Sequence, residues 1–293
     1  GGALGTLIPP SVVTVVYGPA AGLSVGRLLI STIFPGLLLS TIYITYIAIR
    51  SNITPDFAPA IPPEETRIPL KQKLIITATG MVPSLALIFS VMGSIVLGLS
   101  PPTEAAALGA FGSIILTIAY GNFTLQAVKE TVIQTLRISS MMMIILVGGS
   151  MFSGVFLGMG GGEATEKILA ALRLSPWAVL VLFLLIIYIA GFILDWASIL
   201  LVFVPIFSPI IAKLGFDPIW FGTLFIMMIQ TSYLTPPMAP AIFYLKGIAP
   251  PEITTNEIFR GIVAYMFLQL VGIAIVTIFP HIALWLPDKL IRW

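Results

Sequence analysis

The chain has 293 residues, of which 58% are hydrophobic and 9% are charged, and its formal net charge is +2. A soluble domain carries about 25% charged residues, so this composition excludes an ordinary water-soluble domain. The net charge is too small to suggest a nucleic-acid partner. The chain has no cysteine and a single histidine, which excludes thiolate and iron–sulfur chemistry and argues against a histidine-based metal or haem site.

The apolar residues form continuous runs of about 20 residues, the length that a helix needs to cross a bilayer core of roughly 30 Å. Continuous runs, in contrast to alternating short segments, favour helices over a β-barrel. The fold class is therefore predicted as all-α and integral to the membrane. In chain order, clean spans are expected at residues 28–49, 74–98, 105–120, 132–158 and 260–286.

Shorter features separate these spans. Residues 50–73 form a long polar stretch and are predicted as a solvated loop between two halves of the chain. Thr103 follows a Pro-Pro pair and is expected to cap the next helix, with Glu104 in its first turn. The methionines at 141–143 are interpreted as apolar filling. Because the chain opens at Gly1 in an apolar stretch, we interpret it as a fragment that lacks an N-terminal part.

Residues 176–212 differ from the clean spans because two reduced apolar arms flank the polar tip "DWAS" at residues 195–198. The second arm contains Pro205 and Pro209, and a proline removes a backbone donor and clashes with the preceding helical turn. Two short arms around a polar tip predict a re-entrant hairpin, which enters the membrane and returns to the same side.

The same motif interrupts the chain near both ends. "LIPP" at residues 7–10 and "LTPP" at residues 234–237 are followed at the same distance by Tyr17 and Tyr244. Consecutive prolines unwind a helix, and in a membrane unwound backbone survives only where protein or a watery cavity satisfies its polar groups. With the hairpin returning to its own side, the two broken segments cross in opposite directions, as an inverted repeat requires. Freed carbonyls and hydroxyls suit a hard cation such as Na+, and half-helix N-termini suit a carboxylate.

Four segments of the chain together resemble one transporter family. They are "GALGTLIPPSVVTVVYG", "SPPTEAAALGAFG", "GFILDWASILLVFVPIFSPIIAKLGFDPIWFG" and "QTSYLTPPMAPAIFYLKGIAPPEITTNEIFRGI". Over nearly its whole length the chain resembles the large membrane (M) subunit of tripartite ATP-independent periplasmic (TRAP) transporters. The Asp-Trp hairpin tip is similar to that of the branch associated with mannitol/chloroaromatic naming and 2-oxo acid uptake.

This resemblance implies an elevator-type fold of the ion-transporter superfamily, with inverted repeats, in a bacterial or archaeal inner membrane. It implies no enzymatic activity, but secondary active import of carboxylates or related organic anions, with Na+ as the coupling ion. The implied partners are a small membrane subunit and a periplasmic substrate-binding protein, and the family's first hairpin would precede this chain. Residues 1–49 would then end the first repeat, and 50–73 would be the polar loop between the repeats. Residues 74–158 would form scaffold-type helices. Residues 176–247 would hold the hairpin and second broken helix of the transport domain, and 258–293 would form the last span.

Asp195 is the leading site candidate, because an ionisable group within apolar sequence is costly and points to function. Its alternative role, compatible with the first, is to cap the N-terminus of the returning hairpin arm. Gln230 is either a substrate contact or an interhelical hydrogen-bonding residue, and Trp196 is either a wall of the site or an interfacial aromatic. The expected substrate-binding residues are Ser11, Asp195, Trp196, Ser198, Gln230 and Thr235.

The glycines before the first break allow close backbone approach to an ion, or alternatively tight helix packing. For both breaks the other interpretation is a proline kink with no ion bound. The expected Na+ ligands are Gly2, Gly5, Thr6, Pro9, Asp195, Thr231, Ser232 and Thr235, with Pro10, Pro236 and Pro237 as neighbouring helix breakers.

Two other functions stay open at this point. One is a self-sufficient sodium/carboxylate symporter of the same superfamily, which uses no binding protein. The other is a non-transporting membrane subunit of a redox complex, which would need buried Lys, Glu or His within the spans, and almost none is present. Genes for a small membrane subunit and a secreted binding protein beside this one would separate the symporter from the tripartite system.

Overall fold

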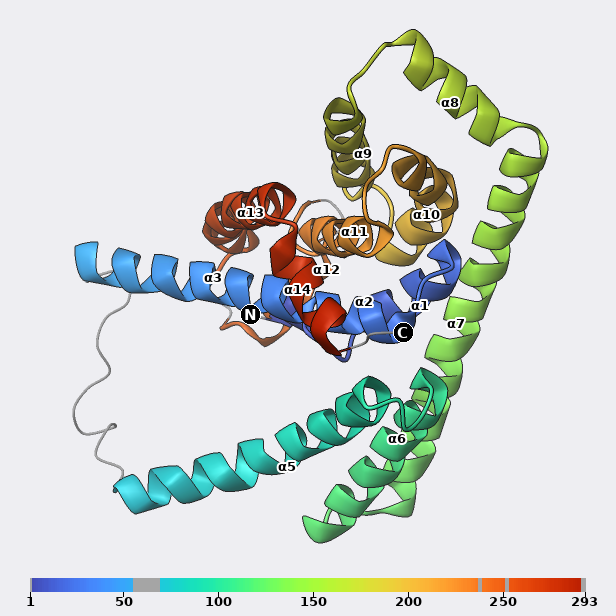
Figure 1. Ribbon diagram of the computed structural model, residues 1–293. Helices are drawn as coiled ribbons and strands as arrows, with labels where there is room; N and C mark the ends of the chain where they lie inside the picture. The colour runs from blue at the N-terminus through green and yellow to red at the C-terminus, as the bar shows by residue number, and fades with distance from the viewer. Residues whose placement is uncertain (1, 55–68, 237–238, 251–252, 291–293) are drawn as a thin grey trace. The chain divides into compact units, whose positions relative to one another are not determined.

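In the computed structural model, which describes residues 2–54, 69–236, 239–250 and 253–290, every regular element is a helix (Figure 1). The described part of the chain contains six helical segments long and apolar enough to cross a membrane: Val25–Ile53, Leu70–Val96, Pro102–Ala119, Leu125–Gly158, Trp196–Lys213 and Thr255–Ile278. The prediction of an all-α, multi-spanning membrane protein is confirmed.

The labels of Figure 1 follow the chain. The helices are the short 3-10 helix η1 (Gly2–Thr6), α1 (Val12–Ala21), α2 (Val25–Ser31), α3 (Ile33–Ile53), α5 (Leu70–Val96), α6 (Pro102–Ala119), α7 (Leu125–Gly158), α8 (Gly161–Ala171), α9 (Pro176–Ala190), α10 (Trp196–Lys213), α11 (Pro218–Ser232), α12 (Pro240–Ile248), α13 (Thr255–Ile278) and α14 (His281–Leu290).

The predicted spans are recovered with shifted ends. α5, α6 and α7 each begin earlier than predicted, because polar residues such as Lys71 and Lys129 are already part of α5 and α7. The span predicted at 260–286 is wrong at its C-terminal end. α13 stops at Ile278 and α14 begins at His281, because Pro280 between them has no N–H with which to continue the helix.

Thr103 is not the helix cap that the sequence predicted. α6 begins at Pro102, Pro101 occupies the N-cap position, and no side chain completes the cap. Proline is favoured at the first helical position, where its fixed φ fits and its missing N–H is not needed, so the helix starts two residues earlier than a Thr103 cap would place it. The loop predicted at 50–73 is too long at both ends, because residues 50–53 belong to α3 and residues 70–73 to α5. Its residues 55–68 lie outside the described residues, as does Pro237.

The chain forms two compact units, one of residues 41–133 and one of residues 1–40 together with 134–293. In the smaller unit, α5 and α6 pack closely in antiparallel directions. A Cβ atom at Gly109 would lie only 2.9 Å from the Val91 side chain, and the Tyr120 hydroxyl donates to the Thr79 carbonyl. Small residues let two membrane helices approach in this way.

The larger unit is built around α11, in which every residue from Ile219 to Ser232 is buried. α9 and α10 contact each other and α11, and Phe183 of α9 stacks on Phe207 of α10 with ring centroids 3.8 Å apart. The Trp220 indole donates to the Val276 carbonyl at 2.9 Å, which ties α13 to α11. A helix that is apolar on all sides needs such cover, so α11 forms the centre of this unit.

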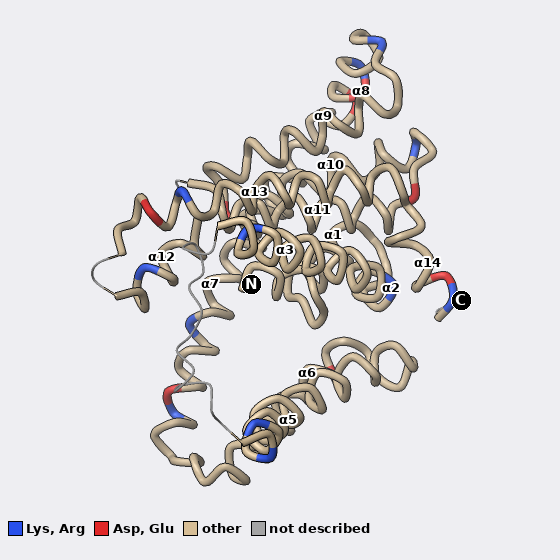
Figure 2. Tube along the Cα trace, turned by 90° about the vertical axis from the view of Figure 1, so that its left-hand side faces the viewer, with Lys and Arg blue, Asp and Glu red and all other residues tan. Residues whose placement is uncertain are grey.

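Charged side chains gather at helix ends and connections, while long helical stretches carry none (Figure 2). Lys213 in the last turn of α10 pairs with Glu166 of α8, and Glu257 completes a capping box at the start of α13. The ends of membrane helices meet water and headgroups, so this distribution fits helices that span a bilayer.

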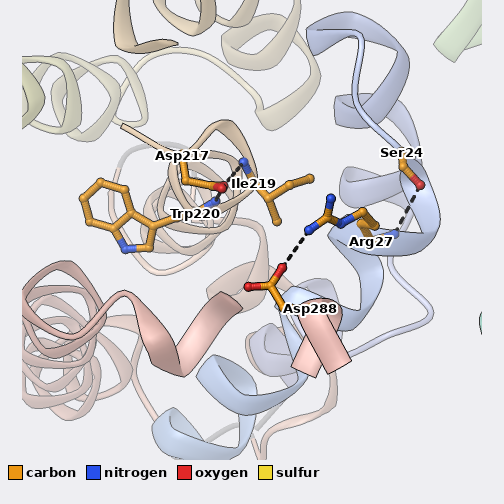
Figure 3. A network of polar contacts seen from close by, with 6 residues as sticks. All are labelled: Ser24, Arg27, Asp217, Ile219, Trp220 and Asp288. Carbon is orange, nitrogen blue, oxygen red and sulfur yellow. Dashed lines mark hydrogen bonds and ion pairs between the residues drawn. The ribbon is translucent and has the colours of Figure 1, made fainter. Parts of the chain in front are cut away.

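Polar contacts also join the C-terminal helix to the larger unit. Arg27 Nη2 of α2 lies 2.7 Å from Asp288 Oδ1 of α14, and the Phe34 and Trp285 rings are 5.6 Å apart. Figure 3 shows this ion pair with the nearby N-cap of α11, where the Asp217 carboxylate accepts from two backbone N–H groups. α14 is therefore docked on α2 at the end of the unit where α11 begins.

Candidate functional site

The first break lies between η1 and α1, where residues 7–11 are not helical. Ser11 caps α1, because its hydroxyl accepts from the Thr14 N–H at 3.4 Å. The same hydroxyl donates to the carbonyl of Thr6. One small side chain thus satisfies both a free N–H after the break and a free carbonyl before it.

Before this break, proline leaves a backbone carbonyl without its helical donor, and glycine leaves the backbone uncovered by side chains. Pro9 has no N–H, so the Gly5 carbonyl cannot receive its usual helical hydrogen bond. A Cβ atom at Gly2 or at Gly5 would meet no atom within 4 Å. Tight helix packing therefore does not explain these two glycines in the described part of the chain.

The second break follows Ser232, the last residue of α11, and α12 resumes at Pro240. The hydroxyls of Thr231 and Ser232 each donate to a carbonyl in the preceding turn at 2.6 Å, and the Thr235 hydroxyl donates to the Thr231 carbonyl at 2.7 Å. Each hydroxyl hydrogen is thus engaged, which leaves oxygen lone pairs able to accept. Pro236 has no N–H, so the Ser232 carbonyl also lacks its usual helical donor.

The turn between α9 and α10 lies at residues 191–194, so the tip predicted at 195–198 is placed too late: Asp195 caps α10 and Trp196 already begins that helix. The carboxylate accepts from the Ala197 N–H at 3.1 Å, from the Ser198 N–H at 3.4 Å and from the Ser198 hydroxyl. The predicted capping role of Asp195 is confirmed. Its half-buried carboxylate also brings a negative charge to the tip.

A cavity of about 530 Å³ brings the two breaks and the hairpin tip together. Gly5, Thr6 and Pro10 line it from the first break, Trp196 from the start of α10 beside the hairpin turn, and Tyr233 from the second break. Its other walls come from the start of α1 and the middle of α7, through Val12, Val13, Ile138, Ser139, Met142 and Met143. A mostly apolar cavity with a few convergent polar groups is the usual form of a small-molecule site.

Residues 1–282 match the family model described as the tripartite ATP-independent periplasmic transporter, DctM component. The chain belongs to the DctM family of TRAP transporter components. It is 31% identical over 290 residues to the C4-dicarboxylate TRAP transporter large permease protein DctM of Pseudomonas aeruginosa, an alignment that covers 99% of the chain and 66% of that relative.

The chain is also similar, over nearly its whole length, to large permease proteins that are named for other substrates. The sialic acid TRAP transporter large permease protein of Vibrio cholerae is 26% identical, with 97% of the chain and 65% of the relative covered. The ectoine/5-hydroxyectoine TRAP transporter large permease protein of Ruegeria pomeroyi is 28% identical, with 96% and 64% covered. The chain thus spans slightly less than two thirds of the length of these relatives.

Not every predicted site residue of this DctM-family chain faces the cavity. Trp196 lines it, and Gly5 and Thr6 line it from the predicted ion site. Asp195 and Ser198, at the start of α10, do not line it, and Ser11, Gln230 and Thr235 are buried and also lie outside its lining. Neither amide atom of Gln230 has a hydrogen-bond partner among the described residues, so the interhelical hydrogen bond considered for it is not formed there.

Sequence reasoning missed part of the lining of this cavity in the DctM-family chain. Tyr233 lines the cavity and is not among the predicted site residues, although it stands beside the second break. Ser139 and Met142 line it from α7, far from both breaks along the chain. The interpretation of the methionine run as apolar filling is wrong for Met141 and Met143, which are 51% and 62% exposed. A hydroxyl next to flexible, polarizable side chains, as at Ser139 and Met142, is the signal by which this wall could have been predicted.

Proposed function

We propose that the chain is the core of a TRAP large permease subunit that imports carboxylates or related organic anions by secondary active transport coupled to Na+. The observation that carries this proposal is the cavity shared by the first break, the hairpin tip and the second break. Broken helices that meet around one cavity are typical of the midplane sites of secondary transporters. Family membership and the transport names of the relatives support the same activity.

For the anion, we propose binding against the start of α1. Val12 and Val13, at the N-terminus of that helix, line the cavity, and a helix N-terminus carries a partial positive charge that favours a carboxylate. Trp196 and Tyr233 would supply aromatic walls, with the Tyr233 and Thr6 hydroxyls as polar contacts. The named substrates of the relatives include a dicarboxylate and sialic acid, which supports an organic anion without naming one.

For Na+, the donor set of the second break fits a hard cation. Such cations take oxygen ligands, and the hydroxyls of Thr231, Ser232 and Thr235 hold their hydrogens toward backbone carbonyls. The Ser232 carbonyl, freed by Pro236, adds a further oxygen, and the Asp195 charge would favour a cation at the tip. At the first break Gly2, Gly5, Thr6 and Pro9 would contribute backbone and hydroxyl oxygens. Bound Na+ would supply the driving force of its gradient.

The proposed partners are a small TRAP membrane subunit and a periplasmic substrate-binding protein, within a bacterial inner membrane. The relatives are named as large permease subunits, and that name presupposes a companion subunit. We propose an elevator-type movement of the hairpin and broken helices for the transport step.

The test is uptake by the complete large subunit in proteoliposomes with its small subunit, its binding protein and labelled 2-oxo and hydroxy acids. We expect uptake to require both an imposed Na+ gradient and the binding protein. Asp195→Asn keeps a good helix cap but removes the charge, so it should abolish Na+-dependent uptake. Asp217→Asn alters the matching cap of α11, at the end of that helix opposite the second break, and should leave uptake intact.

The outcomes separate the alternatives. Uptake without the binding protein would identify a self-sufficient symporter. Uptake driven by a proton gradient and indifferent to Na+ would overturn the ion proposal and keep the transport proposal. Loss of uptake in Thr235→Val but not in Thr277→Val, whose hydroxyl makes the same type of bond within α13 at 2.8 Å, would place the ion at the second break.

A further inference from the structure

The cavity at the breaks has an apolar side, which is formed by α7. It is lined from that helix by Ile138, Ser139, Met142 and Met143. Their four-residue spacing places them on one helical face. Ser139 carries the only hydroxyl among these four, and the other three present hydrocarbon or thioether groups, which attract apolar surface. A ligand in this cavity of about 530 Å³ therefore meets α7 with an apolar part.

The hydrogen-bond donors for a carboxylate gather at the start of α1. The first N–H groups of a helix have no acceptor within it, and the Ser11 cap serves the Thr14 N–H. Those of Val12 and Val13, which both line the cavity, are left without a helical partner. The Thr6 hydroxyl, also in the lining, already donates to a backbone carbonyl at 2.8 Å. Two adjacent N–H groups at a helix N-terminus suit one carboxylate.

A second carboxylate finds no positive charge in this lining. None of the described residues that line the cavity is Lys, Arg or His, and an anion taken out of water without a partner is strongly disfavoured. Asp195 directly precedes Trp196 of the lining, and its negative charge repels a further anion. The Na+ proposed above would be balanced by Asp195, so it does not supply the missing charge.

A polyhydroxylated acid is also poorly matched to this cavity. Besides Thr6, the described lining offers side-chain hydrogen-bond donors at Ser139, Trp196 and Tyr233, while each hydroxyl that a ligand buries without a partner weakens its binding. The rings of Trp196 and Tyr233 instead provide flat apolar faces. The lining therefore favours a ligand whose body is a hydrocarbon chain or ring.

We propose that this site takes a monocarboxylate with an apolar body, and that dicarboxylates and sugar acids are poor ligands of it. The carboxylate binds at the start of α1, and the body lies against Ile138, Met142 and Met143. The inference rests on the transport function proposed above and narrows its substrate class. It separates this chain from relatives named for a C4-dicarboxylate and for sialic acid.

The first test measures the protection of a single cysteine in the cavity, since the 293 residues contain none. Ser139→Cys, in the complete subunit with its small partner and no other cysteine, is treated in nanodiscs with a charged methanethiosulfonate and Na+. Three six-carbon acids compete: hexanoate, the dicarboxylate adipate and the polyhydroxylated gluconate. Hexanoate should halve the rate at a concentration on the order of a hundredfold lower than the other two need, because their extra polar groups stay unpartnered.

Controls for this test are a neutral ligand and a neighbouring position. Hexanamide has the same body without the charge and should protect more weakly than hexanoate. Met141→Cys, at a position that is 51% exposed on α7 and outside the lining, should not be protected by any of these compounds.

The second test locates the apolar body. In the series acetate, butanoate and hexanoate, each added methylene should lower the half-protecting concentration about fourfold, which corresponds to about 0.8 kcal/mol per buried methylene. Met142→Gln places an amide against the body, so it should raise the value for hexanoate about tenfold and leave that for acetate unchanged. Met141→Gln, outside the lining, is the matched control.

Adipate or gluconate protecting as well as hexanoate would overturn the substrate class, as would a Ser139→Cys that no acid protects. Equal protection by hexanoate in Met142→Gln would overturn the place of the body. The uptake experiment above fails or succeeds separately. Na+-dependent uptake of a dicarboxylate in place of hexanoate would leave the transport function standing and overturn the substrate class, whereas hexanoate protection without uptake of any acid would support the class and contradict the transport function.

Discussion

The two breaks share a sequence motif, but the helices that follow them differ in how they are packed. After the first break, α1 is built into the larger unit and Tyr17 is fully buried, whereas after the second break the matching Tyr244 on α12 is 77% exposed. α1 contacts α2, α10 and α11, while the main contact of α12 within the described residues is with α13. The motif therefore determines where a helix breaks, and the neighbours determine what the next half-helix does.

The N-terminus of α1 is also better capped than that of α12. Ser11 caps α1 with a side-chain hydrogen bond. Ala239, at the equivalent position of α12, makes none and has a φ of 20°, in the region that residues with a Cβ rarely adopt. The second half-helix thus begins without the local support that the first one has.

The largest expected change in stability is the difference between alanine substitutions of the two tyrosines. Tyr17→Ala removes a buried ring and should lower the free energy of unfolding by about 3–5 kcal/mol. Tyr244→Ala should change it by less than about 0.5 kcal/mol, because the side chain is exposed. Thermal unfolding of both variants in the same detergent measures the contrast, and equal losses would show that α12 is as tightly packed as α1.

Alanine substitutions of two glycines should change the free energy of unfolding by smaller amounts, and in opposite directions for the two positions. A Cβ atom at Gly18 of α1 would lie 2.6 Å from the Val25 side chain and 3.1 Å from the Leu23 carbonyl oxygen, so Gly18→Ala should destabilise by about 1–3 kcal/mol. At Gly247 of α12 nothing lies within 4 Å, and alanine there should stabilise the helix by up to about 1 kcal/mol. A loss of stability in Gly247→Ala would contradict the open surroundings of α12.

The last prediction concerns the cap of α1. Ser11→Ala should cost about 1–2 kcal/mol, because the Thr14 N–H and the Thr6 carbonyl both lose a partner. Ser11→Asn, which can still accept from Thr14, should recover part of the loss. The midpoint of thermal unfolding reports both changes, and an unchanged midpoint in Ser11→Ala would mean that the first break is as weakly capped as the second.

Local chemistry made several features of the fold predictable. The two Pro-Pro pairs marked both breaks, and Asp195 was correctly expected to cap the returning hairpin arm. Thr103 was a wrong cap because the adjacent Pro102 fits the first helical position better. The end of α13 was missed because Pro280 lies inside an apolar run that reads as one span.

The cavity at the breaks was only partly predictable. Gly5, Thr6 and Trp196 stood out through their motifs, whereas Ser139 and Met142 carry no motif and reach the cavity from α7. Gln230 was chosen for its polarity, but it is fully buried with both amide atoms unpaired and does not line the cavity. Polarity alone does not tell which face of a buried helix a side chain occupies.

The sequence by itself determined the membrane class, the positions of the two breaks and the cap at the hairpin tip. These follow from apolar run length, from the missing N–H of proline and from side chains that bond to their own backbone, all of which act within a few residues. Only the tertiary structure decided that Tyr17 is buried and Tyr244 exposed. Burial depends on contacts with residues such as Gly222 and Phe225, which lie far away along the chain and come close only when the helices pack.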